Sequence, residues 1–464
     1  MTLLELDTGT TAWILASAAL VLLMTPGLAL FYGGMVRAKS VLNMMMMSFG
    51  ALALVAVIWV LYGYSMAFGD DKVGGFFASP FQYLGLKGLM ETINTVTVVV
   101  GPDAANPQQV GEYPAMAFVA FQAVFAIITV ALISGAIADR AKFSTWMIFS
   151  GIWASIVYFP VAHWVFDFSA GEHVGGWIAN NLKAIDFAGG TAVHINAGVA
   201  GLALALILGK RVGWKRDPMR PHNLTLVMIG AGLLWFGWFG FNAGSAVTAN
   251  ATASTVWVNT MVATAAACLG WLLTERFRDG RPTSLGAASG IVAGLVAITP
   301  SCSSVSPVGA ILVGVIAGVV CALAVGLKYK LGYDDSLDVV GVHLVGGLWG
   351  TLSVGFLATA AAPAGVDGLF YGGGVDQLWR QAVGAFAVLF YSLILTLIIG
   401  YALHKTIGFR VTEEDEVSGI DGVEHAETGY DLGSFAAGAR GVSFGGSAPR
   451  QTEIETNHDQ EVTA

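Results

Sequence analysis

Apolar runs of about 20 residues recur along this 464-residue chain, and they constrain its fold more than any other feature. A helix needs about 20 apolar residues to cross the hydrocarbon core of a membrane. Only 11% of the residues are charged, against about 25% in an average soluble domain, so most of the outer surface must face lipid. We therefore predict an all-α membrane protein with eleven transmembrane helices, at residues 11–32, 42–69, 114–138, 143–166, 188–209, 223–245, 254–275, 284–300, 307–328, 340–360 and 380–403.

The basic residues predict the orientation of these helices, because loops on the inner side of a membrane carry an excess of lysine and arginine. One set of connections, together with the C-terminal tail, holds 18 of the 22 lysines and arginines. The opposite set holds only Lys72, Lys87, Lys183 and Arg380. With eleven spans, this asymmetry puts the N-terminus outside and the C-terminus inside.

The chain divides into one helical domain and two tail segments. Residues 1–409 contain the predicted helices and two polar outer loops, at 70–112 and 167–187, of which the first holds a Pro/Asn/Gly stretch at 101–107. Residues 410–432 form a cytoplasmic tail whose acidic segment is Glu413–Glu416. Residues 433–464 are rich in Gly, Ala and Ser, and because they cannot bury enough apolar surface, we predict that they are disordered.

Two segments five spans apart share a pattern that predicts an inverted repeat. One runs from Asp186 to His194 and the other from Asp338 to His343, and glycines follow each histidine at the fourth and seventh positions. An odd number of spans between two equivalent elements reverses their direction across the membrane. The pattern predicts two units of five helices with an eleventh appended, and transport sites lie at the interface of such repeats.

His194 and His343 are the two of the eight histidines that lie well inside predicted spans. Ionisable residues inside a membrane are costly, and they are functional candidates by default. The alternative is that each imidazole only donates a hydrogen bond to a neighbouring carbonyl. His194 lies on a helix that enters the membrane from outside, and His343 on one that enters from inside. If both helices were straight, with a rise of 1.5 Å per residue, the two residues would lie roughly 15 Å apart. They can meet only if aqueous vestibules reach inward and the helices start at a depth other than the membrane surface assigned to them.

Longer motifs in the chain are similar to signatures of the ammonium transporter/methylammonium permease/Rhesus family, over roughly residues 11 to 432. The resemblance implies a homotrimer in a bacterial plasma membrane, with a pore in each subunit that conducts ammonium, as ammonia plus a proton or as net ammonia. Methylammonium would be a second substrate. The motifs are Phe121-Gln-Ala-Val-Phe125, Asp186-Phe-Ala-Gly-Gly-Thr-Ala-Val-His194-Ile-Asn, Gly237-Trp-Phe-Gly-Phe-Asn-Ala-Gly-Ser245, Asn259-Thr-Met-Val-Ala-Thr-Ala-Ala-Ala, Asp338-Val-Val-Gly-Val-His343 and Gly408-Phe-Arg-Val-Thr-Glu-Glu-Asp-Glu416.

The same resemblance implies an outer site that recruits the cation. Phe125, Phe166 and Ser245 would form it, and Phe125 and Phe241 would stack as a gate below it. Many family members carry Trp at the position of Phe166, so Trp164 is an alternative. Judged alone, the aromatic residues also fit a plain core role, and Ser245 fits a small packing residue.

Below the gate, the resemblance implies that His194 and His343 share a hydrogen bond in a narrow apolar pore. Asp186 would support this site without touching the substrate, and its position also suits an N-cap of the helix that follows. A pore that makes the ion shed its proton would reject potassium, which has nearly the same size but no proton to give.

A PII-type nitrogen-regulatory protein is the partner that the resemblance implies at the inner face, where residues 410–432 would act as a regulatory tail. We predict no catalytic residue, no cofactor and no nucleic-acid partner, and three cysteines without paired spacing predict no metal site. Haem binding would need pairs of deep histidines that the sequence lacks. Two alternatives stay open: an ion-coupled carrier of another small cation or amine, and an ammonium sensor on the same scaffold.

Overall fold

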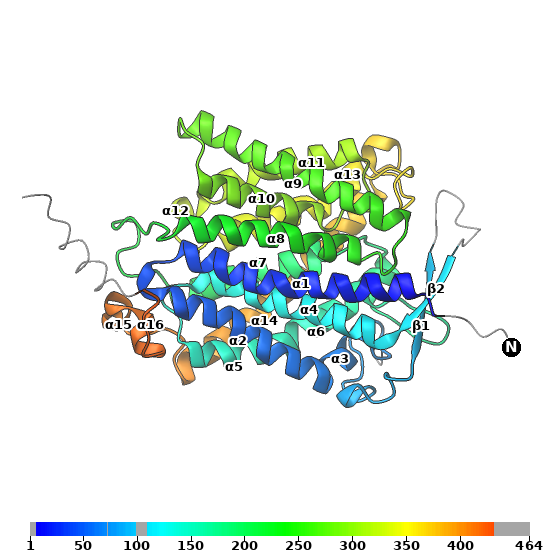
Figure 1. The fold of residues 1–464 in the computed structure, drawn as a ribbon, viewed down its shortest axis with the longest axis horizontal. Coiled ribbons are helices and arrows are strands. Elements are labelled where there is room, and N and C mark those ends of the chain that lie inside the picture. Colours follow the sequence, from blue (N-terminus) through cyan, green and yellow to red (C-terminus); the bar gives the residue numbers. More distant parts are fainter. Residues whose placement is uncertain (1–5, 72, 99–108, 431–464) are drawn as a thin grey trace, which may run out of the picture.

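The computed structural model describes residues 6–71, 73–98 and 109–430. In these ranges long helices run side by side, as Figure 1 shows. The short helices α15 (Glu413–Ser418) and α16 (Ile420–Glu424) lie at the opposite end of the bundle from strands β1 (Ile93–Val98) and β2 (Gln109–Pro114). The predictions for residues 101–107 and 433–464 concern parts of the chain outside the described residues.

Most predicted spans form one helix or a helix continued by a short 3-10 or π turn. The helices are α1 (Thr8–Met35), α2 (Val41–Ile58), α3 (Tyr64–Phe68), α4 (Ala115–Ile133), α5 (Phe143–Trp153), α6 (Phe159–Phe166), α7 (Asn196–Leu208), α8 (Leu224–Gly244), α9 (Ala251–Arg278), α10 (Ser284–Ile298), α11 (Pro307–Ala324), α12 (Leu327–Leu331), α13 (Val345–Leu357) and α14 (Asp376–Thr406). The shorter turns are η1 (Ala38–Ser40), η2 (Trp59–Gly63), η3 (Leu84–Leu86), η4 (Ser134–Ile137), η5 (Ala154–Tyr158), η6 (Ile178–Leu182), η7 (Gly190–Ile195), η8 (Val340–Leu344) and η9 (Leu369–Tyr371).

Ten helical segments in the described ranges are long and apolar enough to cross a membrane. Their bounds agree with ten of the predicted spans to within four residues. The remaining prediction, the short run at 284–300, corresponds to α10, which has 15 residues and is buried along most of its length. A helix that is apolar on all sides belongs inside a bundle or in lipid, and α10 packs against α8, α9, α11 and α13.

The outer loop predicted at 70–112 is not purely irregular, which corrects the all-α prediction for this part of the chain. Strands β1 and β2 pair antiparallel, with Ile93 opposite Pro114 and Val98 opposite Gln109. The sequence of β1, Ile-Asn-Thr-Val-Thr-Val, is rich in β-branched residues, and these favour extended backbone. The hydropathy argument missed the hairpin because it addresses only spans.

The glycines of the repeat pattern set how closely its two elements approach each other. A Cβ at Gly198 would lie 2.4 Å from the backbone nitrogen of Leu344. A Cβ at Gly347 would lie 3.1 Å from the Cβ of His194. Small residues let helix backbones pack closely in membranes, and here they bring η7 and α7 against η8 and α13.

The segment after α14 folds back against the ends of the other helices. Glu416 accepts hydrogen bonds from Arg410 Nη2 and from the backbone nitrogen of Val212, both at 2.7 Å. Asp421 accepts from the backbone nitrogen of Asn43 at 2.8 Å, near the start of α2. The described part of the predicted tail is thus an ordered strap over this end of the bundle.

Candidate functional site

One wall of the site begins at η7, a π-helical turn that Asp186 caps. The Asp186 carboxylate accepts hydrogen bonds from the backbone nitrogens of Gly189 at 2.8 Å, Gly190 at 2.6 Å and Thr191 at 2.7 Å. Gly189 has a φ of +119°, a conformation that suits glycine, so the chain can turn sharply around this carboxylate. Asp186 therefore caps the start of this helix, as its position in the sequence suggested. The cap fixes the start of η7 and with it the position of His194.

The opposite wall begins at η8, and its cap differs from the one that the repeat pattern predicts. Asp335 accepts hydrogen bonds from the backbone nitrogens of Val339 at 3.1 Å and Val340 at 2.7 Å. Asp338, which the sequence pattern paired with Asp186, instead forms an ion pair with Lys328 at 2.7 Å. The equivalent of Asp186 is Asp335, because both carboxylates cap a π-helical start and both precede the histidine by eight residues.

The two histidines meet between these walls. The Nδ1 atoms of His194 and His343 are 3.3 Å apart, and the ring centroids are separated by 5.4 Å with an interplanar angle of 25°. Both side chains are buried, at 1% and 3% exposure. A hydrogen bond between two Nδ1 atoms requires one ring to donate and the other to accept. The pair therefore cannot carry a proton on both Nδ1 atoms at once.

This contact overturns the depth count that left the histidines roughly 15 Å apart. That count assumed that both helices begin at the membrane surface. In the structure η7 and η8 begin at Gly190 and Val340, about one turn before each histidine, and the preceding loops run into the bundle. An outer cavity of about 1250 Å³ also reaches inward as far as Phe125 and Asp186.

The imidazoles line a small cavity of about 10 Å³, which is roughly the space of one water molecule. No carboxylate, lysine or arginine is among the described residues that line it. Trp238 stacks on His194 with ring centroids 5.3 Å apart at 18°. Sequence reasoning missed Trp238, although its place three residues before Phe241 on α8 puts both rings on one helix face. The lining residues are Met24, Leu28, Phe31, Ile128, Leu132, Val193, His194, Leu234, Trp238, Phe241, Val292 and His343.

Two stacked phenyl rings separate the small cavity from the outer one. The ring centroids of Phe125 and Phe241 are 4.2 Å apart, with an interplanar angle of 21°. Phe125 lines the outer cavity, whereas Phe241 lines the cavity around the histidines. The stacked pair therefore lies between the two cavities.

The outer cavity contains the remaining predicted residues except Trp164. Phe166 lies edge-on to Phe125, with centroids 6.2 Å apart at 78°, and lines this cavity. Ser245 also lines it and donates from Oγ to the carbonyl oxygen of Phe241 at 2.8 Å. Trp164 instead donates from Nε1 to the carbonyl oxygen of Phe76 at 2.8 Å and packs on Tyr391. Of the two aromatic alternatives, Phe166 faces the cavity.

An ion-paired histidine joins two loops at the rim of the outer cavity. His173 contacts Asp70 through Nδ1 at 2.7 Å and Asp167 through Nε2 at 2.8 Å. The hydrogen bond to Asp167 outweighs burial and raises the pKa of His173 to about 9. His173 therefore carries a positive charge at neutral pH and ties the loop after α6 to the loop after α3.

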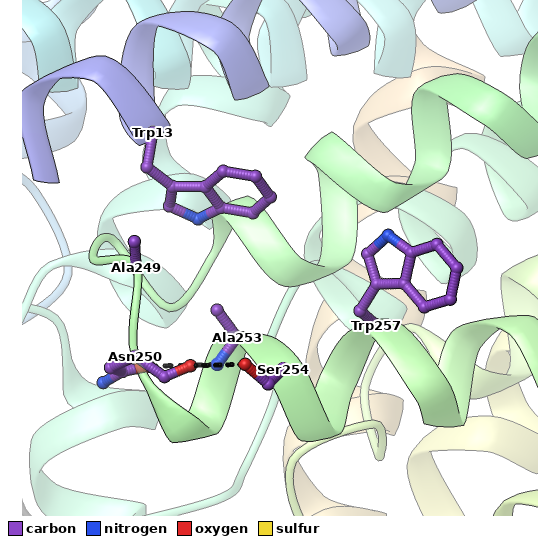
Figure 2. Close-up of a pocket in the computed structure, with 6 residues that line it drawn as sticks. All are labelled: Trp13, Ala249, Asn250, Ala253, Ser254 and Trp257. Atoms are coloured by element: carbon purple, nitrogen blue, oxygen red, sulfur yellow. Dashed lines mark hydrogen bonds between the residues drawn. The ribbon is translucent and has the colours of Figure 1, made fainter. Parts of the chain in front are cut away.

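A further cavity, of about 460 Å³, lies apart from the histidines, beside the first turns of α1 and α9 (Figure 2). Its lining includes Trp13, Trp257 and Asn250, and Asn250 caps α9 by accepting from the backbone nitrogen of Ala253 at 3.0 Å. None of the predicted site residues lines it. Tryptophans near helix ends suit the boundary between lipid and water, so we do not assign this cavity to the pore.

The helices are apolar and long enough to span a membrane, and an aromatic pair lies between a small buried cavity and a larger one that opens outward. These features define a multi-pass membrane transport protein. A profile described as the Ammonium Transporter Family matches residues 12–430. The chain is 64% identical to an ammonium transporter of Mycobacterium tuberculosis over 465 residues, covering 98% of this chain and 95% of the relative. It is 48% identical to an ammonium transporter of Aquifex aeolicus, covering 92% of this chain and 95% of the relative.

Solved structures agree with this assignment. The crystal structure of Saccharomyces cerevisiae Mep2 matches with a TM-score of 0.76 and 32% identity, covering 89% of each chain. A structure titled Sensor Amt Protein matches with a TM-score of 0.79 and 28% identity, covering 90% of this chain and 98% of that one. The chain belongs to the ammonium transporter family, and it is a multi-pass bacterial membrane protein.

Proposed function

We propose that this protein conducts ammonium across the bacterial plasma membrane, as ammonia plus a proton or as net ammonia. The observation that carries the proposal is the pair of touching imidazoles, His194 and His343, in an apolar cavity of about 10 Å³ below two stacked phenyl rings. Family membership supports ammonium as the substrate, and methylammonium follows as a larger analogue.

Recruitment of the cation takes place in the outer cavity, at Phe125, Phe166 and Ser245. Aromatic faces attract cations within about 6 Å, and the attraction strengthens when water is excluded. The Ser245 hydroxyl donates to the carbonyl oxygen of Phe241, so its own oxygen lone pairs stay free to accept an ammonium N–H. Phe125 and Phe241 act as the gate between this site and the pore.

Passage below the gate requires the ion to give up its proton. An intact cation pays heavily to enter apolar surroundings, and the lining of the small cavity offers it no opposite charge. Neutral imidazoles both donate and accept, so His194 and His343 line a path for ammonia and pass the proton separately. Potassium has no proton to lose and is rejected. Asp186 supports the path by holding η7 without contacting the substrate.

The proposed topology has eleven spans, with α10 counted as a short span in addition to the ten longer ones. The segments from α1 to α7 form one five-span unit, those from α8 to α13 form the inverted unit, and α14 is appended. The position of α15 and α16 at the opposite end from β1 and β2 (Figure 1), together with the basic residues, supports the N-terminus outside and the C-terminus inside.

Each subunit of a proposed homotrimer contains its own pore, in a helical domain at residues 1–409. A pore lined by residues of a single chain supports this arrangement, because no second copy is needed to complete it. Large apolar side chains such as Leu269 and Phe277 on α9 and Val308 on α11 are exposed in the single chain. Lipid or a neighbouring subunit must cover them.

A PII-type regulatory protein is the proposed partner at the inner face, where residues 410–432 serve as a regulatory tail. Glu416 is engaged within the chain, whereas Glu413 and Glu414 are exposed and available to a partner. We expect deletion of residues 410–464 to weaken docking and deletion of 433–464 alone to do little. Equal binding of a PII protein by the full chain and the 410–464 deletion would contradict this.

The test of the proposed function is transport in proteoliposomes that contain the purified protein. Ammonium should produce a current or a change in internal pH, methylammonium a smaller one, and potassium none. A response to potassium as large as that to ammonium would favour a general cation carrier. An ion-coupled carrier would need carboxylates deep in the protein to bind the coupling ion. None of the described residues that line the small cavity is a carboxylate, so this alternative has no support there.

Sensing is the second candidate function, favoured by the likeness to the structure titled Sensor Amt Protein. A sensor needs the ammonium signal to reach an output surface, and the ordered strap at 410–430 is the described segment placed to receive it. Ammonium-dependent binding of a partner in a variant without transport would support sensing.

A further inference from the structure

The two histidines of the small cavity have unequal surroundings. Trp238 on α8 stacks on the His194 imidazole, with ring centroids 5.3 Å apart and an interplanar angle of 18°. Phe241 also packs against His194, with centroids 6.1 Å apart. Among the ring contacts in the described part of the chain, His343 has only the one with His194. His194 is therefore the imidazole that other aromatic rings hold in place.

A hydrogen bond fixes the orientation of the Trp238 indole. Its Nε1 donates to Thr299 Oγ1 at 2.8 Å, at the C-terminal end of α10. Thr299 is fully buried, and its hydroxyl has the carbonyl oxygen of Leu295 at 2.7 Å as an acceptor for its own proton. Rotation of the indole would leave a buried N–H unpaired, which is costly. The short helix α10 thus holds the ring on which His194 stacks.

A proton that moves along the histidine pair places a positive charge on His194 for part of its path. A neutral imidazole holds one N–H. When His194 gains a proton at its other ring nitrogen, it is an imidazolium until it gives its Nδ1 proton to Nδ1 of His343, 3.3 Å away. Such a charge is costly among apolar side chains. Trp offers the best aromatic face for a cation within about 6 Å, and Trp238 lies inside that distance.

We propose that Trp238 is a positioning residue for His194. Thr299 holds the indole, and the indole holds the imidazole against His343 and stabilises its charge while it carries the proton. This inference rests on the proposed function and deepens it, because it makes the pair unequal: the positive charge is stabilised on His194 rather than on His343. Trp238 acts through His194, so it should affect the maximal flux and leave recruitment in the outer cavity unchanged.

The first test removes the anchor of the indole in the full-length protein, with ammonium flux measured in proteoliposomes over a range of ammonium concentrations. Thr299→Val keeps the shape of the side chain and removes the acceptor of Trp238 Nε1. It should lower the maximal flux about fivefold and change the half-saturating concentration less than about twofold, and Thr299→Ser should restore the flux. Thr396→Val is the matched control, because Thr396 accepts from the buried Trp153 Nε1 at 2.9 Å and lines neither cavity. Its flux should stay within about twofold of the parent protein.

The second test weakens the face of the indole without moving it. Fluorinated tryptophans keep the N–H that Thr299 accepts, and fluorine withdraws the electron density that attracts a cation to the ring. Trp238 is the one tryptophan among the described residues that line the small cavity, and none lines the outer cavity. Replacement of all tryptophans by mono-, di- and trifluorotryptophan should therefore lower the maximal flux stepwise, by about threefold in all. The flux of Trp238→Phe should not change on fluorination.

Three results would overturn the inference. One is an unchanged maximal flux in Thr299→Val, shown to be folded by size-exclusion chromatography and thermal unfolding. Another is a flux of the otherwise unaltered protein that fluorination does not change, because a ring that only fills space would not respond to the loss of electron density. The third is an equal response to fluorination in Trp238→Phe, which would assign the effect to other tryptophans. Absence of ammonium flux in the parent protein would instead defeat the proposed function.

Discussion

The outer cavity and the cavity around the histidines differ in size and in lining, and the proposed function assigns them to the charged and the neutral form of one substrate. The outer cavity, of about 1250 Å³, is lined by aromatic rings, hydroxyl groups and several ionisable side chains. The inner one, of about 10 Å³, has apolar walls and two imidazoles that contact each other. The stacked rings of Phe125 and Phe241 form the boundary. The difference teaches that selection for a cation and exclusion of a cation can be separate steps, a few ångströms apart.

The largest expected effect follows from removing either imidazole. His194→Ala or His343→Ala interrupts the hydrogen-bonded path and leaves the other ring in an apolar cavity without its partner. We expect ammonium flux to fall by at least about tenfold, which corresponds to a rise of about 1.4 kcal/mol or more in the barrier. The measurement is ammonium flux in liposomes that contain equal amounts of folded protein. Near-normal flux in both variants would show that transport does not need the two histidines.

The next effect concerns the carboxylate that holds one wall of the inner cavity. Asp186→Ala leaves the backbone donors of Gly189, Gly190 and Thr191 without their acceptor. Each unpaired buried donor costs about 1–3 kcal/mol, so we expect a lower unfolding temperature and loss of flux together. Asp186→Asn, which keeps one acceptor oxygen, should lie between the parent and Asp186→Ala in both thermal unfolding and flux. Flux lost without any change in stability would point to direct contact with the substrate instead.

A smaller effect is expected in the outer cavity, where substitutions of Phe166 test how the cation is recruited. Phe166→Trp strengthens cation–π attraction and should lower the half-saturating ammonium concentration about twofold to fivefold, while Phe166→Ala should raise it. Potassium should stay excluded in both variants, since exclusion belongs to the inner cavity. Trp164→Phe is the control, because Trp164 does not line the outer cavity. A larger response to Trp164→Phe than to Phe166→Trp would reverse the assignment of the two residues.

The smallest effect is a pH dependence at the rim. The folded pKa of His173, about 9, exceeds its ordinary value of 6.5, so its contribution to stability is fully present below pH 6.5 and is lost as the pH rises through 9. The groups that face it are Asp70 and Asp167. His173→Gln should therefore lower the unfolding temperature at pH 6 and have little effect at pH 10. A difference from the parent protein that is equal at both pH values would contradict the ion-paired state.

Sequence reasoning predicted the spans well, because apolar length is a local property: the helix at Phe143–Phe166 has the bounds predicted for it. It failed where three-dimensional context decides. The depth count misplaced His194 and His343 because it set the start of both helices at the membrane surface, whereas η7 and η8 begin inside the bundle at Gly190 and Val340. Asp338 stood nearest to the second helix in the sequence, but the chain turns there at a φ of +65°, and Asp335 reaches the backbone donors instead.

The aromatic contacts show the same limit. Phe125 and Phe241 come from helices far apart in the sequence, and the resemblance to a family suggested the stacking that the geometry contains. Trp238 went unnoticed because a tryptophan in an apolar helix is an ordinary core residue until its partner, His194, is placed beside it. Hairpin β1–β2 was missed because its signal is a short β-branched stretch inside a loop.

The most direct test of the account places a fixed negative charge at the histidine pair. In His194→Asp or His343→Glu, a carboxylate about 4 Å from an ion in the narrow passage contributes about 4 kcal/mol of attraction at an effective dielectric constant of ~20. That is enough to hold an ion that has not lost its proton. Paired ammonium and potassium currents from the same liposomes are the measurement. The account predicts that these variants conduct both ions, and continued rejection of potassium with intact ammonium current would contradict it.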